Sequence, residues 1–306
     1  MILILAESTD PWGSALVRRL TSRGEPFVLQ EPRELCASML DRTADWVQRL
    51  TGVYRGTSRP YGEDRGAVHP WAVAAAESGW LAELNALPCP VINRLSPDGA
   101  PSCRTGTPAW EAVVSAHGFQ TPCFYHALNR DEAVAGLDLW GGAAYVKPAG
   151  VLHAGLVLSL EAAKAYAENL EEERPVLLAQ AGQGQLVSVF VVGDKVAATV
   201  MRSMPWSGGG AQGARLDPSL LQRCSEMVLA LGLLHAECLL SLSADGQIAC
   251  LDVVASPNYW TCPREAQRQV VGGLARYLAE GRREAALIPA AMPAGDYAGT
   301  GIPGDR

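Results

Sequence analysis

A single carboxylate stands inside a strongly apolar stretch near the C-terminus. Asp252 lies in LDVVASPNYW, residues 251–260, where the aliphatic neighbours predict a buried strand. A buried carboxylate without a partner is costly, so Asp252 needs a cation beside it. The sequence offers three candidates, which are Lys147, Arg202 and a bound metal ion.

A second carboxylate is predicted on the same face. The apolar stretch that begins near Glu237 is joined to that of Asp252 by Asp245–Gly246, which is typical of a two-residue hairpin turn. Pairing across that turn places Leu239 opposite Asp252 and Glu237 opposite Val254, all on one face. Glu237 and Asp252 are then diagonal neighbours with Cβ atoms roughly 7 Å apart. They could share a cation; alternatively, Glu237 is solvated at the start of its strand.

The two cations each stand at the end of a predicted strand. Lys147 ends AAYVK and is followed by Pro-Ala-Gly, and it faces either solvent or an anion. Arg202 ends a β-rich run and faces either a ligand or a surface carboxylate. The five histidines show no metal-ligand spacing, and none of the eight cysteines forms a C-x-x-C pair.

The elements that must position these residues indicate an α/β (α+β) protein. Strands and helices alternate over residues 1–92, which predicts a mostly parallel sheet. QLVSVFVVGDKVAATVMRS predicts a hairpin with a turn at Gly193–Asp194, and HAECLLSLSADGQIACLDVVAS predicts a second hairpin. The tail 284–306 is rich in Ala, Gly and Pro, and we expect it to be disordered.

Five segments in order resemble the ATP-grasp superfamily, in its peptide-ligase-like (RimK-like) branch. They are VINR, QTPCFYHALNRDEA, AAYVKPAG, SVFVVGDKVAATVMR and ALGLLHAECLLSLSADGQIACLDVVASP. The resemblance covers most of residues 1–280. It implies an N-terminal α/β (pre-ATP-grasp) domain over 1–92, a central α+β subdomain over 93–174, and a C-terminal antiparallel-sheet α+β subdomain over 175–283.

The resemblance also implies ATP and Mg²⁺ as cofactors, because members of the family activate a carboxylate as an acyl phosphate that an amine attacks. Lys147 matches the phosphate-binding lysine, and Arg202 matches an arginine that faces substrate or phosphate. Asp252, with Glu237, would hold the metal. The remaining nucleotide-binding residues implied by the family are Gly150, His153, Gly155, Leu178 and Gln180.

Four positions depart from the family pattern. Thr107 stands where a second ATP lysine is expected, and Ser188 stands where an arginine is expected. Leu239 and Val254 replace the metal aspartate and asparagine, and neither binds a hard cation that takes oxygen ligands.

These departures favour a catalytically degenerate relative that acts as a binding or partner module in a biosynthetic pathway. The alternative is an active ATP-dependent carboxylate–amine ligase with a relocated Mg²⁺ site. The ligand expected for either is an amino acid, a peptide or a peptide-like metabolite, with a partner protein as a further candidate for the module.

Composition excludes other classes of partner. The chain of 306 residues carries a net charge of −7, which argues against nucleic acid and against an anionic membrane surface. No apolar run reaches the roughly 18 residues of a membrane span. The start, MILILAESTD, lacks the features of a signal peptide, so a cytoplasmic location is expected.

Overall fold

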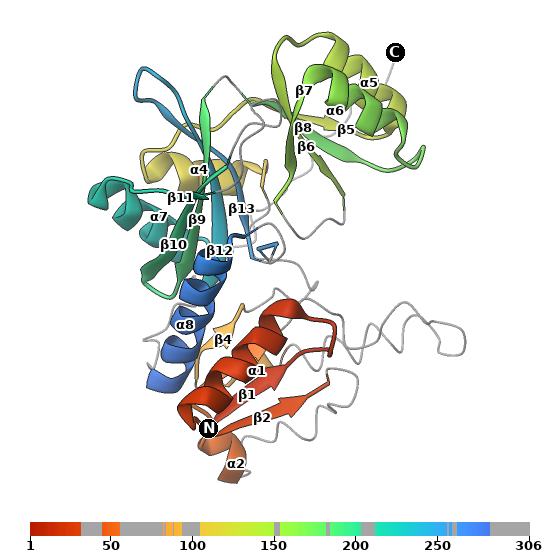
Figure 1. The fold of residues 1–306 in the computed structure, drawn as a ribbon. Coiled ribbons are helices and arrows are strands. Elements are labelled where there is room, and N and C mark those ends of the chain that lie inside the picture. The colour runs from red at the N-terminus through yellow and green to blue at the C-terminus, as the bar shows by residue number, and fades with distance from the viewer. Residues whose placement is uncertain are drawn as a thin grey trace, which may run out of the picture.

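Three β-sheets organise the chain in the computed structural model (Figure 1). The structure describes residues 1–31, 45–55, 82, 84–87, 89–93, 105–149, 154–181, 184–202, 212–255, 257–258 and 262–281. The expected tail 284–306 lies outside the described residues.

The N-terminal sheet is parallel, as the alternating pattern predicts. Its strands follow the order β2-β1-β3-β4. The elements are β1 (Ile2–Leu5), α1 (Pro11–Arg23), β2 (Phe27–Gln30), α2 (Asp45–Gln48), β3 (Gly52–Arg55) and β4 (Val91–Ile92). The carboxylate of Asp10 accepts the first free N–H groups of α1, and Gly24 ends the helix with φ of 66°, in the left-handed region that favours glycine.

The central sheet is antiparallel and has the order β5-β8-β6-β7. The elements are α4 (Pro108–Ala116), β5 (Phe124–Ala127), α5 (Arg130–Asp138), β6 (Ala143–Pro148), β7 (Leu156–Ser159), α6 (Leu160–Glu168) and β8 (Val176–Gln180). Helices α5 and α6 cover one face of this sheet. The domain boundary expected between residues 174 and 175 separates β8 from the sheet to which it belongs, because β8 pairs with both β5 and β6.

The C-terminal sheet has five strands in the order β11-β10-β9-β12-β13. The elements are β9 (Gln185–Val192), β10 (Lys195–Arg202), β11 (Gln212–Gly213), α7 (Pro218–Ala230), β12 (His235–Leu242), β13 (Ile248–Val254) and α8 (Arg264–Glu280). The turn predicted at Gly193–Asp194 is confirmed, since Val192 and Lys195 pair across it. Among the described helices, none combines the length and the apolar character needed to cross a bilayer.

The second hairpin differs from its prediction at the turn. Ser243 donates its N–H to the carbonyl of Gln247, so three residues rather than two form the loop, and Gly246 takes a φ of 83°. A bulge then shifts the register of the β12–β13 pair between Leu239 and Leu240. The extra loop residue and the bulge compensate. As predicted, Leu239 therefore lies opposite Asp252 and Glu237 opposite Val254.

The five-stranded sheet is the centre of the molecule (Figure 1). Helices α4 and α7 pack on one of its faces. On the other face, α8 and the N-terminal unit cover one part, and apolar residues of the central sheet pack against Leu186, Leu239 and Leu251. The candidate site lies on this second face, where the central and C-terminal sheets meet.

Candidate functional site

The four charged side chains singled out in the sequence form two ion pairs. Lys147 of β6 pairs with Asp252 of β13, and Arg202 of β10 pairs with Glu237 of β12. Both carboxylate side chains are fully buried, whereas Lys147 and Arg202 retain 16% and 25% exposure. The cation that the sequence required beside Asp252 is thus a lysine from the facing sheet.

The carboxylate of Asp252 collects donors from three segments of the chain. The ammonium of Lys147 lies 3.1 Å from Oδ1 and 2.9 Å from Oδ2. The Tyr145 hydroxyl donates to Oδ2 at 2.6 Å, and the backbone N–H of Gly155 donates to the same oxygen at 3.1 Å. The Thr105 hydroxyl donates to Oδ1. A carboxylate offers about four lone-pair positions, so these five contacts use its whole accepting capacity.

Tyr145 and Gly155 fit together around this carboxylate. A Cβ on Gly155 would stand 2.5 Å from ring carbons of Tyr145, so the backbone approach needs a residue without a side chain. Burial, and then the charge of Asp252, raise the pKa of Tyr145 well above its usual value. Tyr145 therefore remains a neutral hydrogen-bond donor at physiological pH.

The second carboxylate is held by a hydroxyl and a guanidinium. Ser188 donates to Glu237 Oε1 at 2.7 Å, and Arg202 donates to the same oxygen through Nη2. Arg202 Nε also donates to the Ser188 hydroxyl at 2.5 Å, which closes a triangle of hydrogen bonds. The other oxygen, Glu237 Oε2, is buried and has no hydrogen-bond partner among the described residues.

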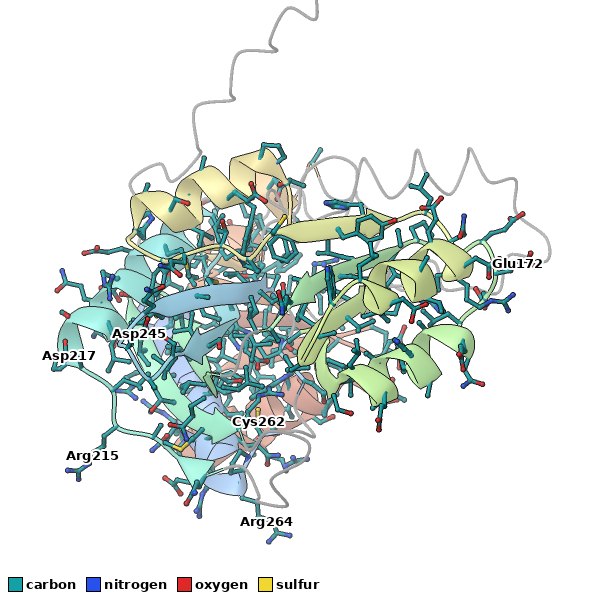
Figure 2. All side chains as sticks on the ribbon, turned by 90° about the horizontal axis from the view of Figure 1, so that it is seen from above. Glu172, Arg215, Asp217, Asp245, Cys262 and Arg264 are labelled. Carbon is teal, nitrogen blue, oxygen red and sulfur yellow. The ribbon has the colours of Figure 1, made fainter. Side chains whose placement is uncertain are left out.

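Cys262 lies near this triangle, inside the body of the molecule (Figure 2). Burial raises the pKa of its thiol to about 12, and the charge of Glu237 adds to the effect while Arg202 opposes it. The thiol donates to the carbonyl of Asn258 at 3.3 Å. A thiol with a raised pKa is a poor nucleophile.

The four departures from the family pattern have structural roles. Thr107 caps the N-terminus of α4, where its hydroxyl accepts the N–H of Trp110 at 3.4 Å. Ser188 belongs to the triangle of Glu237. Leu239 and Val254 are buried, and Leu239 packs against the central sheet. None of the four supplies a cation or a metal ligand.

Leu178 and Gln180, which were also expected at a nucleotide, both lie on β8. The side chain of Leu178 is fully buried against α5 and α6, on the face of the central sheet that these helices cover. Gln180 is exposed, and its amide donates to the carbonyl of Gly141 at 2.9 Å. Gly150 and His153 lie outside the described residues.

Sequence reasoning missed Thr105 and Tyr145. Tyr145 precedes Lys147 by two residues on β6, and residues two apart on a strand share a face, so alternation could have found it. Thr105 lies in the segment before α4, where no periodic pattern indicates its contact with Asp252.

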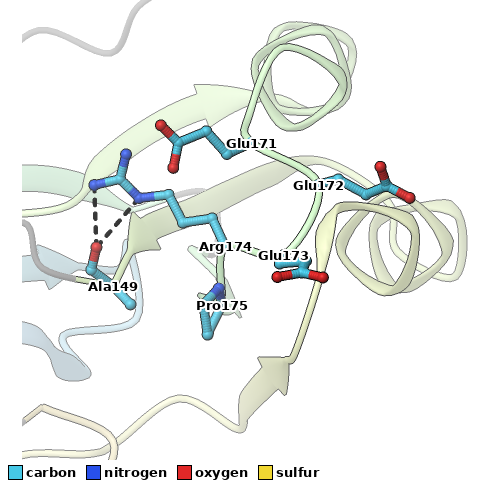
Figure 3. Close-up of a pocket in the computed structure, with 6 residues that line it drawn as sticks. All are labelled: Ala149, Glu171, Glu172, Glu173, Arg174 and Pro175. Carbon is cyan, nitrogen blue, oxygen red and sulfur yellow. Dashed lines mark hydrogen bonds between the residues drawn. The ribbon is translucent and has the colours of Figure 1, made fainter.

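An open recess of about 740 Å³ lies at the end of β6, and it includes none of the charged residues around Asp252 and Glu237. It is lined by Ala149 and residues 171–175. Figure 3 shows Arg174 turned towards Ala149, whose carbonyl accepts from Nε at 3.3 Å and from Nη2 at 3.1 Å. Arg174 thereby fixes the backbone just after β6, two residues beyond Lys147.

These residues do not fit a Mg²⁺ ion. Every lone pair of Asp252 is occupied by donors of the chain, and Glu237 is tied to Arg202. In the described part of the chain, no three His, Cys, Asp or Glu side chains come together in a way that could hold a metal. Magnesium requires several oxygen ligands at close range, and the described residues of this face offer one buried carboxylate oxygen without a hydrogen-bond partner.

No protein-family model and no curated protein matches the sequence. Solved structures do match. The ATP-grasp ligase PsnB, complexed with a minimal precursor, Mg and ADP, is 16% identical with a TM-score of 0.64 over 92% of this chain and 98% of its own. A RimK-domain ATP-grasp protein from Sphaerobacter thermophilus is 20% identical, with a TM-score of 0.53 over 90% and 98%. The macrocyclase MdnC from Microcystis aeruginosa, bound with the precursor peptide MdnA, is 10% identical, with a TM-score of 0.59 over 90% and 98%.

The chain therefore has the ATP-grasp fold of the RimK-like type. Its three sheets are the N-terminal, central and C-terminal parts of that architecture.

Proposed function

We propose that this protein is a catalytically degenerate ATP-grasp protein that binds a peptide or peptide-like partner in a biosynthetic pathway. The ligase chemistry of the fold depends on cations at the phosphates and on oxygen ligands around Mg²⁺. In this chain the matching cations and carboxylates neutralise one another.

One observation carries the proposal, and it is the saturation of Asp252. Five hydrogen bonds from Thr105, Tyr145, Lys147 and Gly155 converge on a carboxylate that has no exposed surface. A metal ion would have to displace Lys147 and at least one neutral donor. The displaced groups would then lie buried without partners, which is unfavourable.

The binding role is supported by the structural neighbours. PsnB and MdnC, which share the fold, are each found with a precursor peptide. In this chain the three parts of the fold are kept, but side chains of the protein itself occupy the positions of the metal ligands. Such a protein is suited to bind a peptide without phosphorylating its carboxylate.

A second candidate function is an active ATP-dependent carboxylate–amine ligase with a relocated metal site. The observation that favours it is Glu237 Oε2, a buried oxygen with no hydrogen-bond partner. Glu237 lies diagonal to Asp252 in the register of β12 and β13, so the two carboxylates are near neighbours. Both oxygens of Asp252 would have to release their present hydrogen-bond donors before Asp252 could bind a metal ion.

Calorimetric titration with ATP and with ADP, each with and without Mg²⁺, distinguishes the two functions. We expect no Mg²⁺-dependent heat from the wild-type protein. The matched variant is Asp252→Asn, which keeps the shape of the side chain and removes its charge. Mg²⁺-dependent binding that Asp252→Asn abolishes would overturn the degenerate reading and support the ligase.

The binding role needs its own experiment. A displayed library of unstructured peptides, panned against the folded protein, should enrich related sequences that also bind the purified chain in solution. A library that shows no enrichment would contradict the proposed peptide recognition.

A further inference from the structure

The guanidinium of Arg55 lies at the carboxyl end of the inner strand β3 of the N-terminal sheet. Arg55 is the last residue of β3, and its Nε is buried and makes no hydrogen bond. Within the described part of the chain, no carboxylate pairs with Arg55. Charged side chains that leave water are normally paired, so an unpaired arginine at this position requires an explanation.

Arg55 keeps its charge although the residue is half-buried. Burial lowers the pKa of the guanidinium to about 10, which is still well above physiological pH. Among the described residues, the charge effect on Arg55 comes from the hydroxyl of Tyr54. The pKa of Tyr54 is itself raised well above its usual value by burial and then by Asp10. Within the described residues, this positive charge therefore has no neutralising partner.

Asp10, a carboxylate at the start of α1 in the same unit, already accepts hydrogen bonds from other groups. Its Oδ1 accepts the N–H groups of Trp12 and Gly13 at the start of α1, at 3.0 and 3.2 Å. Its Oδ2 accepts the hydroxyl of Tyr54 at 3.2 Å. The first turn of α1 is thereby capped from within, so that helix terminus is not a free anion site.

The location of Arg55 is where ligands bind in open parallel sheets. The strand order is β2-β1-β3-β4, so the chain leaves β1 towards β2 and leaves β3 in the opposite direction, towards β4. In open parallel sheets, ligands bind in the crevice between the carboxyl ends of two neighbouring strands from which the chain leaves in opposite directions. Arg55 lies at that end of β3, in register with Leu5, the last residue of β1.

The surroundings of Arg55 favour a charged ligand. Arg55 shares its face of the sheet with Val53, which packs in an apolar cluster with Leu3, Leu5 and Val47. An ionic contact is stronger beside such apolar surface than in open water.

We propose that Arg55 binds an oxyanion, the carboxylate or phosphate group of a small ligand, at the carboxyl edge of the N-terminal sheet between β1 and β3. The planar guanidinium suits either group because it donates two parallel N–H bonds to two oxygens. This site is independent of the Lys147–Asp252 region and does not rest on the proposed function.

The test uses inorganic phosphate and succinate as probes on the full chain, with sodium chloride at equal ionic strength as the reference. Calorimetry should detect binding of at least one probe. Arg55→Gln should weaken that binding about 10- to 100-fold, the range for one or two charge-assisted hydrogen bonds. The matched control is Arg49→Gln, because Arg49 is an exposed arginine of the same unit that pairs with Asp45 at 3.9 Å.

The outcomes separate clearly. Preference for succinate identifies a carboxylate ligand, and preference for phosphate identifies a phosphate ligand. Binding that Arg55→Gln leaves intact, or that Arg49→Gln weakens equally, overturns the site, as does the absence of binding by both probes.

A measurement on the wild-type chain covers the case in which Arg55→Gln does not fold. In protein labelled with ¹⁵N-arginine, the Nε–H resonance of Arg55 should shift with phosphate or succinate and stay in place with chloride. Arg55→Lys, which keeps the charge, identifies that resonance by its loss. A resonance that does not respond to either probe contradicts the proposal.

Discussion

The ammonium of Lys147 bridges both carboxylate oxygens of Asp252, at 3.1 and 2.9 Å, and so joins the central sheet to the five-stranded sheet. Tyr145 and Gly155 reach the same carboxylate from the central sheet and its adjoining loop. One side chain of β13 is thus held by several groups across the junction of two sheets. The Lys147–Asp252 contact thus stabilises the packing of the central sheet against the five-stranded sheet.

Breaking this pair from the lysine side should be strongly destabilising. Lys147→Met leaves a buried carboxylate without its counter-ion, and we expect a loss of about 3–5 kcal/mol in the free energy of unfolding. The double variant Lys147→Met with Asp252→Leu should recover much of that loss, because no buried charge remains. Urea unfolding of the wild type, the single variant and the double variant measures both effects.

An exposed pair of the same central unit provides the control. Lys164 and Asp138 join α6 to α5 at 2.5 Å, with side chains 32% and 59% exposed. Lys164→Met should cost less than about 1 kcal/mol, as exposed ion pairs do. Equal losses for Lys147→Met and Lys164→Met would contradict a buried joint at Asp252.

The hairpin of Glu237 and Asp252 shows what the sequence could predict. The turn signal and strand alternation predicted which residues face one another, and Leu239–Asp252 and Glu237–Val254 are paired as expected. The loop length was wrong, since three residues form the turn, and only the bulge restores the pairing. Local patterns specify which residues alternate, but a bulge depends on packing against the facing sheet.

The partner of Asp252 marks the limit of such reasoning. The cost of burying a carboxylate predicted a cation, and it narrowed the choice to Lys147, Arg202 or a metal. Choosing between them requires knowing how the central sheet lies on the C-terminal sheet, which no local pattern contains. Arg202 instead pairs with Glu237, which was expected to be solvated or to share a metal.

Gly155 should tolerate no side chain. A Cβ there would meet the Tyr145 ring at 2.5 Å, and Tyr145 is fully buried and bonded to Asp252. We expect Gly155→Ala to destabilise the protein by about 1–3 kcal/mol, the range for forced overpacking. Thermal unfolding measures the change.

Gly272→Ala is the control for that substitution. Gly272 lies within α8, and nothing stands within 4 Å of the position that its Cβ would take. Alanine favours helix over glycine, so this variant should gain about 0.5–1 kcal/mol. A loss at Gly272 comparable with that at Gly155 would show that the clash with Tyr145 is not the cause.

Divalent cations should leave the stability of the wild-type protein unchanged. A ligand that binds only the folded state raises the melting temperature, and the residues around Asp252 and Glu237 do not fit such an ion. Melting curves in excess Mg²⁺ and in EDTA should therefore coincide. A higher melting temperature in Mg²⁺ that Asp252→Asn removes would instead reveal a metal site on this face.

His235 should make the stability depend on pH. Its imidazole is buried beside Trp12, with ring centroids 5.7 Å apart, and within the described part of the chain its Nε2 has no hydrogen-bond partner. Burial lowers its pKa from 6.5 to about 4. Between these values the unfolded chain binds more protons than the folded one, so stability is fully present above about pH 6.5 and is lost as pH falls towards 4.

The size of this effect follows from the two pKa values. On lowering the pH from 7 to about 4.5, His235 should remove about 2–3 kcal/mol from the free energy of unfolding. His235→Phe keeps a ring against Trp12 but cannot titrate, so this variant should lose correspondingly less over the same interval. Urea unfolding of both proteins at the two pH values gives the loss of unfolding free energy in each. The contribution of the carboxylates, which both proteins share, cancels when one loss is subtracted from the other. Equal losses in the two proteins would mean that His235 binds a proton in the folded state near its ordinary pKa. The imidazole would then not be buried away from water between α1 and β12.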